Sequence, residues 1–437
     1  MFARVRYFFA DLGHWIGSHK LVCGALALAV LAIGAAATYV ATDDDDAPAG
    51  PAPAPQIVVA QAPAPEDAEE LGFPAFATKN TTRVAGADPI ANAAGVSLAV
   101  NPSTGESPAP DAVVLVDADE WQAGVAAASL AAAPVGAPLL VTEGGEVPSL
   151  TESALRELGP EGSSATAGRQ VFVVGDAAAP EDYEVLELNG GDDAEVAAEI
   201  ERLRTRLTDN PEHILVTSSE AAAYAMPAAG WAARSGDPVL FVGEDGIPEA
   251  TIDALRRNDG TPVYVFGPES AISERTMKEI ERIAPSARRV GDEGPVENAI
   301  AFARFVDGSF GWNINDPGHG FVIANTDRPL DAAIAAPLSA SGTWGPLLVT
   351  DDAGRLPAPL AEYLLDLKPG YEDDPTRALY NHVWLIGDTS AVSVDLQAEA
   401  DELAEVTRIT SGSGESVDPA QGAPESQPDE PNPNDDR

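Results

Sequence analysis

One phrase occurs three times in this chain of 437 residues. It reads "GAPLLVTEGGEVP" at Gly136–Pro148, "GDPVLFVGEDGIP" at Gly236–Pro248 and "GPLLVTDDAGRLP" at Gly345–Pro357. Each copy is a short apolar run followed by an acidic, glycine-containing turn that ends at proline. Recurrence at a nearly constant spacing is typical of one structural unit that has been copied in tandem. The sequence therefore predicts three related modules.

Strand-length apolar runs alternate with helical stretches around each phrase. In the first copy, "VVLVDA" (Val113–Ala118), "APLLVT" (Ala137–Thr142) and "VFVVGD" (Val171–Asp176) are separated by predicted helices. Continuous apolar strands are buried on both faces, as in doubly wound parallel sheets. We therefore predict an α/β fold of three tandem Rossmann-like or flavodoxin-like parallel-sheet modules.

The copies also match in their last strand and the helix that follows it. "GPESAIS" (Gly267–Ser273) recurs as "GDTSAVS" (Gly387–Ser393), and the final serine of each is predicted to cap the next helix. The first copy has a proline-containing loop instead. A module of about four strands is small for an independent domain. We expect the three modules to pack as a pseudo-trimer within one chain.

The N-terminal region contains an apolar run, Leu21–Ala41, that is long enough to cross a bilayer as a helix. Arg4, Arg6 and Lys20 precede it and four aspartates follow, which predicts that the remainder of the chain lies outside the cell. The length of the run favours a retained signal-anchor over a cleaved signal peptide. The single cysteine, Cys23, excludes an internal disulfide, and its flanking residues fit a lipoprotein signal poorly.

These observations give a full domain organisation and a location. We predict a single-pass cell-membrane protein with an extracellular C-terminal portion associated with the cell wall. The predicted segments are a cytoplasmic N-terminus (1–20), a transmembrane signal-anchor (21–41), a Pro/Ala/Asp-rich linker (42–80), repeat modules 1 (81–185), 2 (186–287) and 3 (288–410), and a disordered acidic tail (411–437).

The charge of the chain excludes one class of partner. With 70 acidic and 25 basic residues, the net charge of −45 predicts repulsion of nucleic acid. The excess of acid suits either a protein that works in high salt or a member of an acidic proteome, and the sequence leaves both open.

Several stretches together resemble the cell wall-binding repeat 2 family. They are "RVAGADPIANAAGVS" (Arg83–Ser97), "LDAAIAAPLSA" (Leu330–Ala340), the "PLLVT" strands and "VWLIGDTSAVS" (Val383–Ser393). The resemblance implies an exported protein whose three tandem repeats hold it non-covalently on a cell-wall polymer. It also implies a binding role for the apolar strand residues Leu139, Leu140, Val141, Thr142, Val239, Leu240, Phe241, Leu347, Leu348, Val349 and Thr350.

Polar residues just after strands are a second group of candidates, because ligands of open α/β sheets bind beyond the carboxyl ends of the strands. In the third copy Asp331 starts a helix, where it could bind a ligand or only cap the helix. The aromatic residues Trp121, Trp231 and Trp344 could stack on sugars or pack between modules. The polar candidates are Asp117, Asp119, Ser218, Ser219, Asn325, Thr326, Asp327 and Asp331.

The sequence gives little support for catalysis. The histidines are scattered, and the common hydrolase, zinc-protease and phosphate-loop motifs do not occur. We predict no enzymatic activity, no cofactor and no metal site. The leading hypothesis is a membrane-anchored protein that binds a cell-wall polysaccharide or another envelope polymer. The alternatives are an exported enzyme that modifies wall glycans, and a scaffold of degenerate repeats that binds an unknown protein partner.

Overall fold

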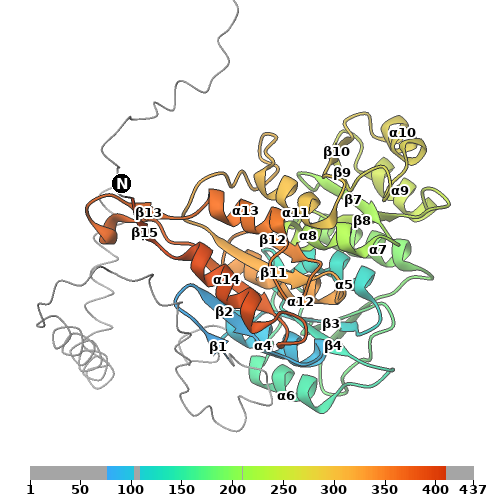
Figure 1. Cartoon of the computed structure of the whole chain (residues 1–437). Coiled ribbons are helices and arrows are strands. Elements are labelled where there is room, and N and C mark those ends of the chain that lie inside the picture. Colours follow the sequence, from blue (N-terminus) through green and yellow to red (C-terminus); the bar gives the residue numbers. More distant parts are fainter. Residues whose placement is uncertain (1–75, 103–108, 209, 410–437) are drawn as a thin grey trace, which may run out of the picture. The chain divides into compact units, whose positions relative to one another are not determined.

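The computed structural model of the chain describes residues 76–102, 109–208 and 210–409 (Figure 1). The predicted cytoplasmic segment, the predicted membrane span 21–41 and the predicted tail 411–437 lie outside these residues. Within the described residues, no helix has both the length and the hydropathy needed to cross a bilayer. Phe76–Ala77, at the end of the segment predicted as linker, forms the short strand β1.

The described part of the chain has an α/β fold with three parallel four-stranded arrangements, which we call lobes 1, 2 and 3. The strand order is β4-β3-β5-β6 in lobe 1, β8-β7-β9-β10 in lobe 2 and β12-β11-β14-β2 in lobe 3. Their bounds are β3 (Val113–Asp117), β4 (Leu139–Thr142), β5 (Val171–Val174), β6 (Val185–Leu188), β7 (Ile214–Ser218), β8 (Val239–Val242), β9 (Val263–Phe266), β10 (Arg288–Val290), β11 (Gly320–Asn325), β12 (Leu347–Thr350), β14 (His382–Ile386) and β2 (Thr81–Val84).

Each lobe takes its fourth strand from the start of a different repeat. β6 and β10 begin the second and third repeats, yet they pair with β5 of lobe 1 and β9 of lobe 2. β2 begins the first repeat and pairs in parallel with β14 of lobe 3, about 300 residues away in sequence (Figure 1). β1 adds to the outer edge of β2 in the antiparallel direction. The exchange of strands therefore links the three repeats in a closed ring: the second repeat contributes a strand to lobe 1, the third to lobe 2, and the first, through β2, to lobe 3.

The helices form four groups, and the helices within a group occupy the same place in different repeats. Each repeat has an opening helix, a central helix and an outer helix, and only the second and third repeats have a last helix. The groups are α4 (Pro89–Val100), α7 (Asp193–Thr208) and α11 (Pro295–Arg304); α5 (Trp121–Ala127) with the 3-10 turn η1 (Ala128–Ala131), α8 (Ala222–Ser235) and α12 (Leu330–Ser341); α6 (Ser149–Leu158), α9 (Glu249–Arg257) and α13 (Ala358–Asp366); and α10 (Glu274–Ile283) and α14 (Val394–Ala404). A short pair of strands, β13 (Gly370–Tyr371) and β15 (Thr407–Arg408), and the turn η2 (Pro375–Arg377) complete the described elements.

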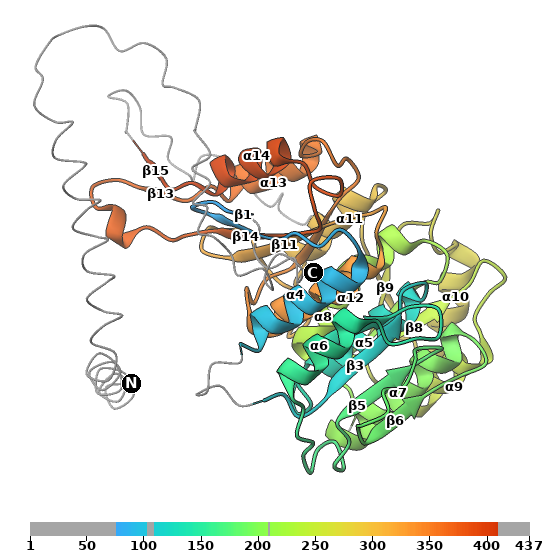
Figure 2. The same ribbon diagram turned by 90° about the horizontal axis from the view of Figure 1, so that it is seen from below.

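The three central helices pack against one another where the lobes meet (Figure 2). They are rich in alanine, and α5 and α8 each contain one glycine, so their backbones approach closely. A Cβ atom added to Gly124 of α5 would lie 2.7 Å from Leu330 of α12, and one added to Gly230 of α8 would lie 3.1 Å from the Leu347 side chain. Small residues at these positions thus permit contact between lobes.

Local signals in the sequence explain several helix starts. Asp88 accepts the Ala91 N–H at 2.8 Å ahead of Pro89, as predicted for α4. Ser273 and Ser393 accept N–H groups at the starts of α10 and α14, at 3.2 and 3.1 Å, which confirms both predicted caps. The first repeat has no helix after β5, again as predicted.

Candidate functional site

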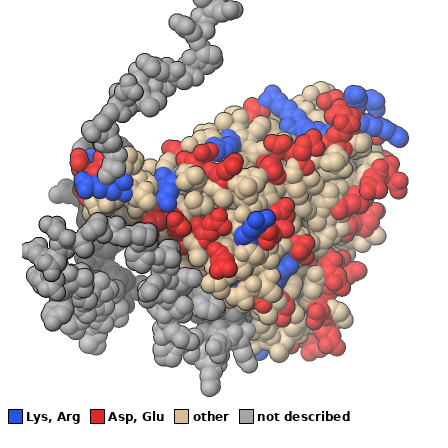
Figure 3. All heavy atoms as spheres, viewed as in Figure 1, with Lys and Arg blue, Asp and Glu red and all other residues tan. Residues whose placement is uncertain are grey.

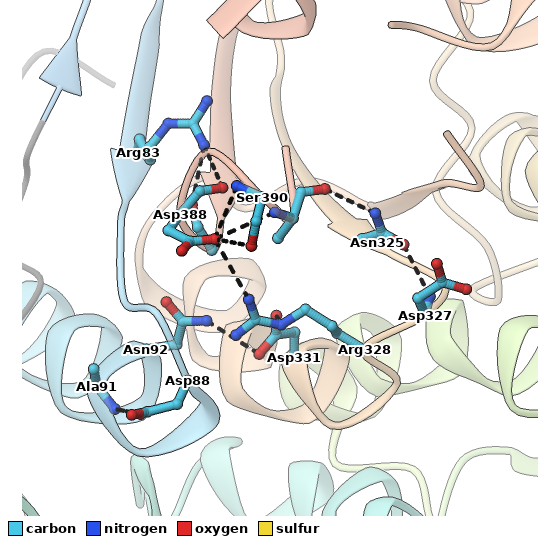
Figure 4. Close-up of polar contacts among 12 residues, drawn as sticks. Arg83, Asp88, Ala91, Asn92, Asn325, Asp327, Arg328, Asp331, Asp388 and Ser390 are labelled. Carbon is cyan, nitrogen blue, oxygen red and sulfur yellow. Dashed lines mark hydrogen bonds and ion pairs between the residues drawn. The ribbon is translucent and has the colours of Figure 1, made fainter. Parts of the chain in front are cut away.

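Polar side chains gather at the carboxyl ends of the lobe 3 strands, where α4 and α12 begin (Figure 4). We call this group the lobe 3 polar site. Its members come from the opening helix of the first repeat, the β11–α12 turn and the loop after β14. They are Asp88, Asn92, Asn325, Asp327, Arg328, Asp331, Asp388 and Ser390.

The turn after β11 is built by Asn325, one of the predicted residues. Its amide donates to the Ala391 carbonyl at 2.7 Å, and its side-chain oxygen accepts the Asp327 N–H at 2.9 Å. Thr326, another predicted residue, donates its N–H to the Thr350 carbonyl at 2.9 Å. These bonds tie the ends of β11, β12 and the β14 loop together and leave the Asp327 carboxylate exposed.

The same turn occurs at the equivalent place in the other two lobes. Asp117 accepts the Asp119 N–H at 3.2 Å in lobe 1, and Ser218 accepts the Glu220 N–H at 3.2 Å in lobe 2. Side chains of this kind commonly close such turns by bonding to the backbone two residues ahead. Asp117 is buried and shapes the turn, whereas Asp119 is exposed and accessible to a ligand.

Asp331 is the most deeply buried acid of the site, with no exposed surface. It lies one residue inside α12 and its side chain makes no capping bond, so the interpretation as a cap is wrong. Instead it accepts from the Asn92 amide at 3.2 Å and lies 2.9 Å from Nε of Arg328. The helix begins at Leu330, so Asp331 lies in its first turn and its carboxylate contacts Asn92 of α4.

Burial raises the pKa of Asp331 to about 6, although Arg328 and Asn92 act in the opposite direction. Its Oδ2 atom faces Arg328 without a hydrogen bond of good geometry. The carboxyl group of Asp331 therefore gains or loses its proton in weakly acidic conditions.

Arg328 links this buried acid to the surface. Its side chain is 19% exposed and lies between Asp331 and Asp388, whose Oδ1 is 3.9 Å from Nη1. The pKa of Asp388 is lowered: burial acts to raise it, but hydrogen bonds from Ser390 outweigh that effect. Nη2 of Arg328 and Oδ1 of Asn92 are buried and have no partner in the described part of the chain. The interior of the site therefore contains one donor and one acceptor whose hydrogen bonds are not made.

The loop that carries Asp388 is held by Arg83 of β2, which is fully buried. Burial lowers the pKa of Arg83 to about 10, while Asp388 acts to raise it. Its guanidinium donates to Gln397 Oε1 (2.9 Å) and to the carbonyls of Gly387 (3.0 Å), Asp388 (3.0 Å), Val392 (2.5 Å) and Ser393 (3.1 Å).

A hollow of about 580 Å³ lies at the carboxyl end of β12 in the same lobe. Asp351, Asp352 and Arg355 line its polar side, and Leu356 and Pro357 line its apolar side. The Ser393 hydroxyl donates to the Gly354 carbonyl at 2.8 Å, which joins this turn to the β14 loop. The hollow thus extends the polar edge of lobe 3.

The predicted apolar binding residues form the cores of β4, β8 and β12. All of them are buried, and the hydroxyl groups of Thr142 and Thr350 are satisfied by the Ala178 N–H and the Asp352 carbonyl. Their binding role stays a prediction. The residues are Leu139, Leu140, Val141, Thr142, Val239, Leu240, Phe241, Leu347, Leu348, Val349 and Thr350.

The three tryptophans behave differently from one another. Trp121 packs edge-to-face on Phe241 of lobe 2, with ring centroids 6.0 Å apart. Trp231 is buried, and its indole N–H donates to Asp237 at 2.9 Å. Trp344, by contrast, is 62% exposed. Packing between modules thus accounts for two of them and leaves Trp344 available to stack on a sugar.

Arg328, Asn92 and Asp388 were missed by the sequence reasoning. All three lie in or beside stretches that carried the family resemblance, so the signal was present. What the sequence did not show is that α4 of the first repeat faces α12 of the third.

Comparison with known proteins supports a wall-binding family for part of the chain. Residues 187–277, which contain most of the second repeat, match the family described as cell wall binding domain 2 (CWB2). Among solved structures, the chain is similar to Cwp6 from Clostridium difficile, with a TM-score of 0.60 and 18% identity over 76% of this chain and 49% of that one. It is also similar to Cwp8 from Clostridium difficile, with a TM-score of 0.55 and 19% identity over 74% of this chain and 52% of that one.

The chain therefore spans about half the length of these two structures, and at this identity they establish the fold alone. No curated protein matches the chain in sequence. The match at residues 187–277 confirms the resemblance to the cell wall-binding repeat 2 family in the second repeat and supports an association with the cell wall.

Proposed function

We propose that this protein attaches non-covalently to a hydroxyl-rich, uncharged polysaccharide of the cell envelope, and that the lobe 3 polar site makes the decisive contacts. The observation that carries the wall-binding function is the match of residues 187–277 to cell wall binding domain 2. The three lobes would act together as a pseudo-trimer, which the mutual packing of the three central helices supports.

The charge around the site is the reason to propose an uncharged polymer. The site contains the acids Asp88, Asp327, Asp331 and Asp388, and the charge of Arg328 already faces the last two. Carboxylates are spread over the visible face of the molecule, and basic side chains form a few separate groups (Figure 3). A polyanion would be repelled by such a surface, whereas sugar hydroxyls can donate to carboxylates and accept from Arg328.

The site is incomplete in the other two lobes, which supports unequal roles for the three repeats. Ala123 in lobe 1 and Tyr224 in lobe 2 occupy the places equivalent to Asp331. The Tyr224 hydroxyl donates to the Glu293 carbonyl at 2.6 Å, so this position makes a different contact in lobe 2. Lobe 3 would be the principal site, with Asp119 marking a weaker position in lobe 1.

The N-terminal run 21–41 would hold the protein in the membrane while the folded part reaches the wall. In this proposal the chain is a tether between two layers of the envelope. The length of this apolar run and its charged flanks support export and a retained signal-anchor.

The test is sedimentation of the detergent-solubilised full-length chain with purified envelope polysaccharides. Arg328→Gln should reduce retention about tenfold, because one charged hydrogen bond contributes about 1.5 kcal/mol or more. Arg256→Gln on the exposed face of α9 is the matched control and should bind normally.

Retention should persist as salt is raised, because no net ionic attraction is lost by screening. Binding that requires an anionic polymer and disappears in salt would contradict the proposed ligand. Absence of retention on every envelope fraction would contradict wall attachment itself.

A further inference from the structure

A serine, a histidine and an aspartate lie in line at the amino ends of the lobe 2 strands, away from the polar site. His213 immediately precedes β7 and Asp237 lies just before β8. Nδ1 of His213 is 3.1 Å from Oδ2 of Asp237, and Nε2 is 3.2 Å from the hydroxyl of Ser309. Ser309 comes from the loop between α11 and β11, 96 positions from His213.

The hydrogen bonds around Asp237 fix the orientation of the imidazole. Oδ1 of Asp237 accepts the backbone N–H of His213 at 3.0 Å, and Oδ2 accepts the Trp231 indole N–H at 2.9 Å. An ionised carboxylate can only accept, so the neutral imidazole carries its proton on Nδ1. Nε2 is then left as an acceptor directed at the Ser309 hydroxyl.

The protein buries His213 and Asp237 but leaves Ser309 exposed. His213 is 6% and Asp237 is 2% exposed, and the imidazole packs against Phe310 and Tyr264 with ring centroids 5.2 and 5.8 Å away. Ser309, in contrast, is exposed.

A tight turn presents the serine. Asp307 and Phe310 bond to each other through both backbone pairs, at 2.8 and 3.1 Å, and Gly308 takes a φ of +65°. Within the described residues, the N–H groups of Gly308 and Ser309 donate to no protein acceptor. They are therefore free to stabilise a negative charge that develops beside the serine.

We propose that Ser309 is a nucleophile, with His213 as its general base and Asp237 as the residue that positions His213, and that the site cleaves carboxylic esters. The Ser309 oxygen bonds to the ester carbonyl carbon and its proton passes to Nε2 of His213. The bond to the alcohol then breaks, and the alcohol takes that proton. Water, deprotonated by the same nitrogen, attacks the acyl-serine and releases the carboxylic acid.

The exposure of Ser309 indicates the class of ester. A nucleophile at the tip of a surface turn can reach a small acyl group carried on a long, exposed chain. O-acyl substituents of a polysaccharide have this form. The proposal does not depend on polymer binding by lobe 3. Its residues lie at the amino ends of the lobe 2 strands, whereas the polar site lies at the carboxyl ends of the lobe 3 strands. It gives a structural basis to the alternative of an exported enzyme that modifies wall glycans.

The experiment uses an alkyl fluorophosphonate on the solubilised full-length chain. An activated serine oxygen displaces fluoride and forms a stable bond to phosphorus, which intact mass and peptide mapping locate. We expect Ser309 to react at least about a hundredfold faster than Ser286, an exposed serine with no histidine partner, because a general base typically contributes about 10²–10⁴-fold. Equal rates at Ser309 and Ser286 would refute the proposal.

Variants separate the roles of the three residues. Ser309→Ala should lose both the adduct and the hydrolysis of p-nitrophenyl acetate, with an unchanged thermal transition because the side chain is exposed. His213→Gln and Asp237→Asn should each slow phosphonylation of Ser309 by about tenfold or more.

A denatured control covers the case in which either buried variant fails to fold. In concentrated urea the wild-type chain should label Ser309 no faster than Ser286, because the histidine is no longer held beside it. A rate advantage that persists in urea would show that the folded arrangement does not activate the serine.

Discussion

Replacing Asp331 with asparagine should change how the stability of the protein depends on pH. The side chain is fully buried, and burial raises its pKa from 3.8 to about 6. This rise corresponds to about 3 kcal/mol, because one pKa unit is equivalent to about 1.4 kcal/mol. The penalty belongs to the charged form of Asp331 and is absent when the group is protonated.

The sign follows from proton binding. Between pH 4 and pH 6 the folded state holds a proton on Asp331 that the unfolded state has released. The contribution of Asp331 to stability is therefore full below about pH 4, falls as pH rises toward 6, and stays low above that. Asp331→Asn keeps the shape of the side chain but cannot ionise. The variant should gain about 3 kcal/mol relative to wild type between pH 4 and pH 7.

Urea unfolding of both proteins, followed by circular dichroism at a series of pH values, measures this difference directly. Acids that do not interact with Asp331 titrate equally in both proteins and cancel in the comparison. Asp327→Asn, four residues away and exposed, is the matched control and should follow wild type. If the difference in free energy of unfolding between wild type and Asp331→Asn stays constant from pH 4 to pH 7, the raised pKa assigned to the buried Asp331 carboxyl is refuted.

Three further outcomes follow from the contacts of lobe 3 and the strand exchange. Arg83→Met should lower the free energy of unfolding by about 3 kcal/mol in urea titrations, since buried carbonyls lose their donor. Ser393→Ala should cost about 1 kcal/mol by the same measurement, because α14 loses its cap. The lobes should unfold in one calorimetric transition, because each sheet contains a strand from a different repeat; separate transitions would contradict this.

Much of the fold could be predicted because local chemistry repeats in the sequence. The continuous apolar strands, the serine caps at Ser273 and Ser393, and the missing helix after β5 are all set by nearby residues. The strand exchange depends on how repeats pair in space. β6 and β10 are three to four residues long and look the same in sequence whichever lobe they join. Periodicity alone therefore did not assign them.

The candidate site was only partly predictable for a related reason. Asn325 and Asp117 could be placed at strand ends, because parallel strands end at a common edge. The pairing of Asn92 with Asp331 joins residues 239 positions apart, and that of His213 with Ser309 joins residues 96 apart. Such pairs have no spacing motif, since each is created by contact between repeats rather than within one.

Two buried or half-buried arginines show how the strand exchange supports the loops beside the sites. Arg83 of β2 donates to the carbonyls of Gly387 and Val392, and Arg289 of β10 donates to those of Gly267 and Ile272, each at 2.5–3.0 Å. These carbonyls belong to the same turn, between the third strand and the last helix of each lobe. In lobe 1 the equivalent residue of β6 is Glu187, and there the last helix is absent.

In lobes 2 and 3, therefore, the strand that comes from another repeat carries the arginine that holds the loop before the last helix. In lobe 3 that loop presents Asp388 and Ser390 to the polar site. The pairing of β2 with β14 places Arg83 where it holds this loop, so we expect the polar site to depend on that pairing. Arg83 therefore links the closure of the ring to the candidate binding site, because it lies on the strand that closes the ring and bonds to the loop that carries Asp388.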